Sequence, residues 1–119
     1  MAQRIAGTAY VKADGVQYTL AGRLTVSPSN TEREGLAGLS GPAGYKETPR
    51  IPFVEGDVHT TADLKIADLE QITDATIKVE LANGKIYLLR EAWCTSALEI
   101  DASEGTVGVR FEGMEGKEL

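Results

Sequence analysis

The sequence contains very few of the residues that perform most enzymatic chemistry. Its 119 residues include one histidine, His59, and one cysteine, Cys94. A nucleophile activated by a base needs such groups in combination, and a zinc site needs several cysteines or histidines at set spacings. Glu55, Asp57 and His59 alternate as a metal-ligand set would, but a solvated strand edge explains this pattern better. The sequence therefore predicts no enzyme, with no catalytic residue, metal site or cofactor.

Long apolar runs are also missing, as is a second cysteine. The longest apolar runs are a few residues, whereas a membrane helix needs roughly 20. The N-terminal stretch lacks the apolar core of a secretory signal, so we expect synthesis and assembly in the cytoplasm, without a membrane. Cys94 cannot form an internal disulfide, and beside Trp93 we expect it to be buried as a small apolar group.

Positive charge is scarce, which bears on the class of partner. The net charge is −6, and a protein that grips nucleic acid needs an excess of lysine and arginine to neutralise phosphates. Residues 1–54 carry six basic and four acidic residues, or +2, and residues 55–119 carry six basic and fourteen acidic residues, or −8. This polarity favours head-to-tail self-association, although a solvated surface with uneven charge explains it equally well.

The clearest structural signal is a β-hairpin at residues 76–93. Asn83 and Gly84 accept the positive φ angles of a two-residue type I′ turn, and such a turn pairs Leu81 with Ile86. Because side chains alternate between faces, one apolar face is expected to carry Ile77, Val79, Leu81, Ile86 and Leu88. The other face is expected to carry Lys78, Glu80, Lys85, Tyr87 and Leu89. This second face is more apolar than a solvated sheet face needs, which favours a contact there with something other than water.

A second two-residue turn is predicted at Asp14-Gly15, between strands at residues 5–13 and 16–21. Two pairs follow from its register: Val11 with Tyr18, and Ala9 with Leu20. A further strand is expected at residues 23–27, where polar and apolar residues alternate before Pro28.

The second half of the chain adds more strands and one helix. Residues 51–60 are predicted to be extended, with Pro49 and Pro52 confining the start of the strand to an edge. Residues 95–100 and 106–112 are predicted to pair. One face of that pair carries Val107, Val109 and Phe111.

The helix is predicted over residues 62–72, where Leu64, Leu69 and Ile72 recur near helical spacing. Thr60 or Thr61 is expected to cap it, with Asp63 in its first turn. The tail, residues 113–119, is polar and predicted to be loose.

Residues 28–50 show no persistent periodicity and are predicted to form a long loop. Four glycines are expected to make it flexible: Gly35, Gly38, Gly41 and Gly44. Six residues are predicted to contact a neighbouring subunit: Arg33, Leu36, Leu39, Tyr45, Lys46 and Arg50. The apolar members of this set favour an arm that a partner orders, with a floppy insertion as the alternative.

These elements predict one domain over residues 1–119. It is mainly β, a sandwich or barrel of about seven strands, with one short flanking α-helix, the long loop at about 28–50 and the loose tail from about 113.

Several short motifs follow one another along nearly the whole chain. They are Gly41-Pro-Ala-Gly-Tyr45, Pro49-Arg50-Ile51, Glu55-Gly-Asp-Val58, Asp63-Leu64, Asp68-Leu69 through Ile72, Val79-Glu-Leu81, Asn83-Gly-Lys85, Ala92-Trp93, Glu104-Gly-Thr106 and Val109-Arg-Phe-Glu-Gly113. In this order the chain resembles the phage tail tube proteins of the Mu type. The resemblance implies a tail-tube-like subunit that assembles into hexameric rings, which stack into a hollow tube in the virion tail.

The resemblance also implies partners. These are further copies of the chain, the tape-measure protein, the tail terminator, baseplate or tail-tip proteins, and a sheath protein if the tail is contractile. DNA is expected to pass through the lumen without specific binding, in agreement with the acidic composition. Two alternatives stay open: a secretion-type tube protein, and a monomeric β-barrel module that binds a sugar or peptide.

Overall fold

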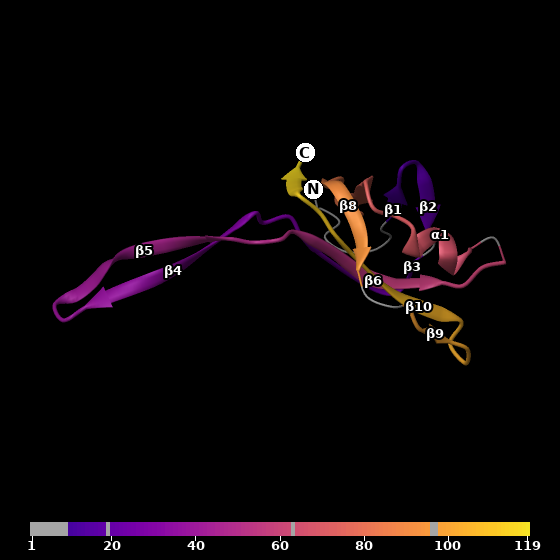
Figure 1. Ribbon diagram of the computed structural model, residues 1–119, viewed down its shortest axis with the longest axis horizontal. Helices are drawn as coiled ribbons and strands as arrows, with labels where there is room; N and C mark the ends of the chain where they lie inside the picture. Colours follow the sequence, from indigo (N-terminus) through magenta and orange to yellow (C-terminus); the bar gives the residue numbers. More distant parts are fainter. Residues whose placement is uncertain (1–9, 19, 63, 96–97) are drawn as a thin grey trace, which may run out of the picture.

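The computed structural model describes residues 10–18, 20–62, 64–95 and 98–119, and within them the chain is mainly β (Figure 1). It has eleven strands and one short helix in these ranges. The elements are β1 (Tyr10–Ala13), β2 (Val16–Tyr18), β3 (Leu20–Ser27), β4 (Thr31–Gly38), β5 (Gly41–Pro49), β6 (Phe53–His59), α1 (Ile66–Glu70), β7 (Ala75–Glu80), β8 (Ile86–Thr95), β9 (Ile100–Asp101), β10 (Thr106–Glu112) and β11 (Glu115–Glu118).

Strand β8 connects the two halves of the body. The strand order is β2-β1-β7-β8-β10-β6-β3, with β11 also paired to β8 and β9 paired to β10. The first half of β8 pairs with β7 and β11, and its last three residues pair with β10. Between them Glu91 has a φ of 50° and the register with β7 shifts, so the strand changes direction there. The prediction of a sandwich or barrel with one short helix is confirmed.

One apolar core fills the space between the two halves. It combines side chains from β1, β7 and β8 with side chains from β6 and β10. The largest fully buried members include Ile77 and Val79 of β7 and Val107 of β10. The predicted alternation in β10 is confirmed, because Val107, Val109 and Phe111 are all at most 5% exposed. These residues alternate because only one face of the strand meets the core.

The central hairpin forms, but its predicted register is wrong by one residue. The loop has three residues, with Gly84 at a φ of 89°, and the Leu81 N–H donates to the Lys85 carbonyl at 2.9 Å. This is the loop in which a turn is followed by a left-handed glycine, and it fits the same Asn-Gly pair as a two-residue turn. The shift pairs Val79 with Tyr87.

A shift of one residue moves every side chain of β8 to the other face. The predicted faces are therefore wrong for this strand. Leu89 is buried at 2% exposure and Tyr87 packs against the core, whereas Ile86 and Leu88 lie opposite Glu80 and Lys78 on the outer face.

The Asp14-Gly15 hairpin agrees with prediction. Both residues have positive φ, 48° and 85°, as a type I′ turn requires, and Val11 pairs with Tyr18. Ala9 and the start of the predicted first strand lie outside the described residues. Leu20 pairs with Val58 of β6, because the chain has by then entered β3.

Strand β6 is central, which corrects the expectation that its start lies at an edge. It pairs with β10 on one side and β3 on the other from Phe53 onward. Pro52 directly precedes the strand, and Pro49 is the last residue of β5, so neither proline lies within β6. The predicted pairing of residues 95–100 with 106–112 is only partly correct, because Thr95 ends β8 and β9 contributes two residues, with Ile100 opposite Val107.

The helix is shorter than predicted. Its N-cap is Lys65, without a side-chain hydrogen bond, so neither Thr60 nor Thr61 caps it. Residues before it form a turn, in which the Leu64 N–H donates to the Thr61 carbonyl at 3.0 Å. Leu69 anchors the helix at 1% exposure, and Asp63 lies outside the described residues.

Two stretches predicted to be irregular are strands. The tail forms β11, which pairs with β8 from Glu115 opposite Arg90 to Glu118 opposite Tyr87. Residues 28–50 form β4 and β5, a two-stranded antiparallel sheet that projects from the body as a ribbon (Figure 1). Both faces of this ribbon are exposed, so its sequence carries none of the alternation that marks a half-buried strand.

Candidate assembly surfaces

The ribbon of β4 and β5, called the arm below, is the most prominent surface feature. It occupies one end of a molecule whose extents are 61 × 42 × 27 Å (Figure 1). Among the described strands its two strands pair only with each other, and every side chain of β4 is exposed. A two-stranded hairpin without a packed face is marginally stable in water, so the arm has the character of a segment made for contact.

Two of the predicted contact residues are already paired within the arm. The Arg33 guanidinium donates to Glu47 at 2.7 Å and lies 5.4 Å from the centre of the Tyr45 ring. The Lys46 ammonium lies 3.2 Å from a carboxylate oxygen of Glu34. Exposed ion pairs of this kind contribute about 0–1 kcal/mol each, so their main effect is to align the two strands.

The end of the arm is apolar and has no core beneath it. Leu39 is fully exposed, Tyr45 is 62% exposed and Leu36 is 45% exposed. Ala37, Pro42 and Ala43 are exposed beside them. Apolar groups gathered on a projecting hairpin are unfavourable in water, and a second surface that covered them would stabilise them. We call this exposed apolar surface the tip patch: Leu36, Ala37, Leu39, Pro42, Ala43 and Tyr45.

The four glycines predicted to give flexibility have two different roles in the arm. Gly41 and Gly44 have φ angles of 122° and 141°, which residues with a side chain rarely adopt. Gly41 directly follows the turn of the hairpin, and Gly44 lies at its bulge. Gly35 lies inside β4, opposite Tyr45, and Gly38 ends the strand, opposite Gly41.

Arg50 lies at the base of the arm, away from the tip patch. Its guanidinium donates to the Ser27 hydroxyl at 2.7 Å and lies 5.7 Å from the centre of the Phe53 ring. The structure thus places five of the six predicted contact residues on the arm and the sixth at its root.

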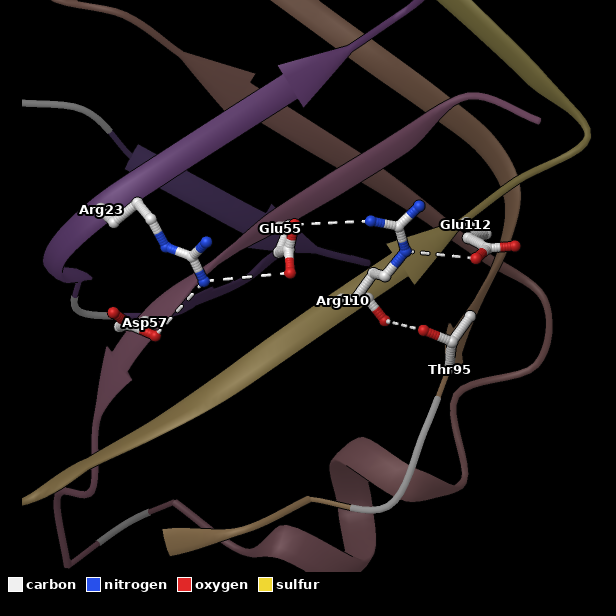
Figure 2. A network of polar contacts seen from close by, with 6 residues as sticks. All are labelled: Arg23, Glu55, Asp57, Thr95, Arg110 and Glu112. Atoms are coloured by element: carbon white, nitrogen blue, oxygen red, sulfur yellow. Dashed lines mark hydrogen bonds and ion pairs between the residues drawn. The ribbon is translucent and has the colours of Figure 1, made fainter. Parts of the chain in front are cut away.

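A network of ion pairs covers the outer face of β3, β6 and β10 (Figure 2). Glu55 lies between two arginines, 3.4 Å from Arg110 and 3.9 Å from Arg23. Arg23 also reaches Asp57 at 3.9 Å, and Arg110 donates to Glu112 at 3.2 Å. The Arg110 guanidinium lies 3.9 Å from the centre of the Phe53 ring. No local sequence pattern predicts this stacking, because Phe53 and Arg110 are 57 positions apart.

This network accounts for the acidic pattern noted in β6. Glu55 and Asp57 are ion-pair partners of arginines, and His59 is exposed at the end of the strand. Within the described ranges, no group of three or more histidine, cysteine or acidic side chains could hold a metal ion.

The outer face of β1, β7, β8 and β11 is different in character. Lys12 lies opposite Lys78, which lies opposite Leu88, which in turn lies opposite Lys117. In the next row Tyr10 lies opposite Glu80, and Glu80 opposite Ile86. This face mixes lysines with apolar side chains. On this face Ile86 and Leu88 occupy the positions beside Lys78 and Glu80 where Tyr87 and Leu89 were predicted.

Two side chains at the other end of the body have raised pKa values. Burial raises the pKa of the Tyr18 hydroxyl, and the negative charges of Asp68, Cys94 and Asp14 add to the effect. Burial also raises the pKa of the Cys94 thiol, with a smaller contribution from Glu70. Cys94 is half-buried, in partial agreement with the expected buried thiol.

The nearby cavity does not resemble a ligand site. It has a volume of about 310 Å³, is open to solvent, and is lined partly by Asp14, Asp68 and Asp74. Binding sites for drug-sized molecules bury most of the ligand and are lined mainly by apolar side chains. In the described part of the chain, α1 is too short and too polar to span a membrane.

Comparisons with known proteins agree with this arrangement. The family model described as "Phage tail tube protein" matches residues 2–118. The Mu-like prophage FluMu tail tube protein of Haemophilus influenzae is 29% identical over 119 residues, which is 100% of this chain and 99% of that protein.

Solved structures support the fold. The tube-terminating cap of the anti-feeding prophage has a TM-score of 0.68 at 12% identity, covering 100% of this chain and 93% of the other. Hcp1 from Flavobacterium johnsoniae has a TM-score of 0.63 at 14% identity, covering 92% and 93%. The sheath/tube terminator of the extracellular contractile injection system PVC has a TM-score of 0.64 at 10% identity, covering 93% and 92%. The chain belongs to the phage tail tube protein family, and it is a structural component of the virion tail and not an enzyme.

Proposed function

We propose that this chain assembles into hexameric rings, and that the rings stack into the tube through which phage DNA leaves the virion. Membership of the tail tube family supports this proposal. The observation that carries it furthest is the arm, which presents an exposed apolar tip patch at one end of the molecule. A neighbouring copy is the partner that this patch fits, because burial of Leu36, Leu39 and Tyr45 would remove the apolar surface from water.

The strand edges support closure of a ring. β2 and β3 stand at the two ends of the strand order, and each therefore has one edge without a partner among the described strands. β3 is eight residues long, and exposed edges of that length readily pair with other chains. Subunits that join their sheets edge to edge around a ring leave no such edge exposed.

DNA slides through a lumen that offers few free positive charges. Six copies of a chain with net charge −6 make adhesion of DNA unfavourable unless basic residues cluster inward. The outer face of β3, β6 and β10 (Figure 2) would offer few free positive charges to DNA, because Arg23 and Arg110 are paired with carboxylates. Tight, salt-sensitive binding of duplex DNA to the assembled protein would contradict a non-adhesive lumen.

In the virion this tube would have partners at each end and inside. These are the tail terminator, the baseplate or tail-tip proteins and the tape-measure protein, with a sheath protein around the tube if the tail contracts. Assembly would take place in the host cytoplasm.

A secretion-type tube is the alternative function. The fold shared with Hcp1 favours it, at an identity that supports the fold alone. The monomeric ligand-binding module has less support, because the cavity beside α1 is open and acidic.

Electron microscopy of the purified chain tests the proposal. Negative-stain images at increasing protein concentration, in low and moderate salt, should show rings about one subunit thick or tubes. Analytical ultracentrifugation of the same samples should show a hexamer or larger species. A monodisperse monomer at every concentration and salt, also after addition of the tape-measure protein or a tail initiator complex, would contradict self-assembly.

A further inference from the structure

Asn30 binds the backbone of the C-terminal strand with both ends of its side-chain amide. Its Oδ1 accepts from the Gly116 N–H at 2.8 Å, and its Nδ2 donates to the Gly116 carbonyl at 2.9 Å. The N–H and the carbonyl of Gly116 both point to the side of β11 that faces away from β8, as they do at every second residue of a strand in an antiparallel pair. Because β8 occupies the other side, Asn30 takes the place of a neighbouring strand at this position.

Pro28 closes over the same glycine. A Cβ at position 116 would lie 2.5 Å from the Pro28 carbonyl oxygen and 2.8 Å from the Pro28 Cα. Contacts this short with backbone atoms cannot be relieved by rotation of a side chain. Gly116 is buried, so only glycine lets residues 28–30 lie this close to β11.

The second strand of the arm is tied to the same place. The Arg50 N–H donates to the Asn30 carbonyl at 2.9 Å, and the Arg50 guanidinium donates to the Ser27 hydroxyl at 2.7 Å. Asn30 directly precedes β4 and Arg50 directly follows β5. Both ends of the arm are therefore held against the body by one group of contacts, which we call the root clamp: Pro28, Asn30, Arg50 and Gly116.

We propose that Asn30 and Gly116 are positioning residues, which set the direction in which the arm leaves the body. Within the described part of the chain β4 and β5 pair only with each other, so a ribbon without the root clamp would be joined to the body by two single chain segments. Such a ribbon would sample many directions, and ordering it on a neighbour would cost conformational entropy. The C-terminal strand thereby sets the direction of the arm, although Gly116 is 86 residues from Asn30 in the sequence.

This inference rests on the proposed function only where it concerns assembly. The direction of the arm is a property of the single subunit and can be measured on a monomer. Loss of the root clamp should leave the core intact, because Asn30 is exposed and lies outside the apolar cluster.

Distances between spin labels measure the direction of the arm. One label is attached at Leu39→Cys at the tip and one at Lys65→Cys on the body, in a Cys94→Ala background so that no third thiol is labelled. Both positions are exposed, and Lys65 makes no side-chain capping bond. With the root clamp intact, double electron–electron resonance on dilute monomer should give one narrow distribution of distances between the two labels.

Three variants separate the root clamp from the fold. Asn30→Ala removes both hydrogen bonds, Asn30→Asp keeps only the acceptor, and Gly116→Ala forces Pro28 away. Each should broaden the distribution and lower the yield of tubes. Asn30→Ala should lower the yield about tenfold or more, since the loss of two hydrogen bonds shifts an opening equilibrium by roughly that factor. Ser29→Ala and Gly108→Ala are the matched controls. Ser29 is exposed and makes no side-chain hydrogen bond within the described ranges, and a Cβ at position 108 would have 3.5 Å to its nearest neighbour.

The outcomes distinguish this inference from the proposed function. A distribution in Asn30→Ala and Asn30→Asp as narrow as in the parent would overturn the positioning role, whether or not tubes form. A broad distribution with normal tube yield would overturn the link to assembly. If the parent itself never forms tubes, the proposed function fails, and the monomer distances still decide whether the root clamp directs the arm.

Discussion

Leu89 lies directly against Gly113. A Cβ at position 113 would be 2.7 Å from the Leu89 Cγ and 2.8 Å from the Arg90 carbonyl oxygen. Leu89 is 2% exposed and belongs to the core, so it has no free space to retreat into. The chain passes from β10 to β11 over this contact, and the C-terminal strand can reach β8 only if residue 113 has no side chain.

Gly113→Ala should therefore destabilise the fold. Overpacking against backbone and core atoms costs about 1–3 kcal/mol, and we expect a loss in this range in the free energy of unfolding, measured with urea. Gly22→Ala is the control, because a Cβ there would meet nothing within 4 Å. An alanine at position 113 that leaves the urea midpoint unchanged would show that β11 can shift away from Leu89.

Stacking of Arg110 on Phe53 should contribute more than that of Arg50 on the same ring. The two guanidinium carbons lie 3.9 Å and 5.7 Å from the ring centre. A double-mutant cycle of Arg110→Ala and Phe53→Leu should give a coupling energy of about 0.5–1 kcal/mol. The cycle with Arg50→Ala is the matched comparison and should give a smaller value. Equal couplings would mean that distance to the ring does not decide the interaction.

The stability of the fold should decrease above pH 9. The ordinary pKa values of Cys94 and Tyr18 are 9.0 and 10.0, and both are raised in the folded protein. A raised pKa in the folded state means that the unfolded chain releases its proton first, so stability is full below pH 9 and is lost as the pH rises. Urea unfolding from pH 7.5 to 10.5 measures the decline, which should be shallower in Cys94→Ala and in Tyr18→Phe. An unchanged slope in both variants would contradict this assignment.

The sequence predicted best where one face of a strand is buried. β10 alternates because Val107, Val109 and Phe111 meet the core while their neighbours meet solvent. The Asp14-Gly15 turn was also predicted correctly, since a type I′ turn demands positive φ at both positions. In these regions the pattern reflects a local physical requirement.

It predicted poorly where the structure depends on distant contacts. The arm is exposed on both faces, so residues 31–49 show no alternation although they form two strands. β11 exists because Gly113 and Gly116 allow close approach to Leu89 and Pro28, and no local pattern reveals such a fit. The predicted register of the central hairpin is wrong by one residue because Asn83-Gly84 fits both a two-residue and a three-residue loop.

The same limit applied to the assembly surfaces. The apolar residues of the arm were identified from composition, because a solvated loop does not need Leu36, Leu39 and Tyr45. Asn30 was missed, since its partner is 86 positions away. The pairing of Arg33 and Lys46 within the arm was also missed, because it depends on the register of β4 and β5.

A charge at the tip patch should block assembly and leave the subunit folded. Leu39→Glu changes a fully exposed side chain, so the free energy of unfolding should change by less than about 0.5 kcal/mol. Tubes should be lost, because the carboxylate would have to be buried against the neighbour. Ile100→Glu, which changes a 54% exposed apolar residue on β9, is the control and should leave tube yield unaffected. Normal tubes from Leu39→Glu would show that the tip patch is not part of the contact.

Hydrogen exchange should show that assembly stabilises the arm. In the single subunit the hydrogen bonds between β4 and β5 have no apolar layer over either face, so they open easily and the amides of residues 35–50 should exchange quickly. In tubes the same amides should become protected by a factor of about ten or more, because a covered tip patch makes opening of the ribbon costly. Amides of β7, whose core side chains are fully buried, are the internal reference and should exchange slowly in both states. An arm as protected in the monomer as in the tube would mean that β4 and β5 are stable alone, and that the neighbour adds nothing to their order.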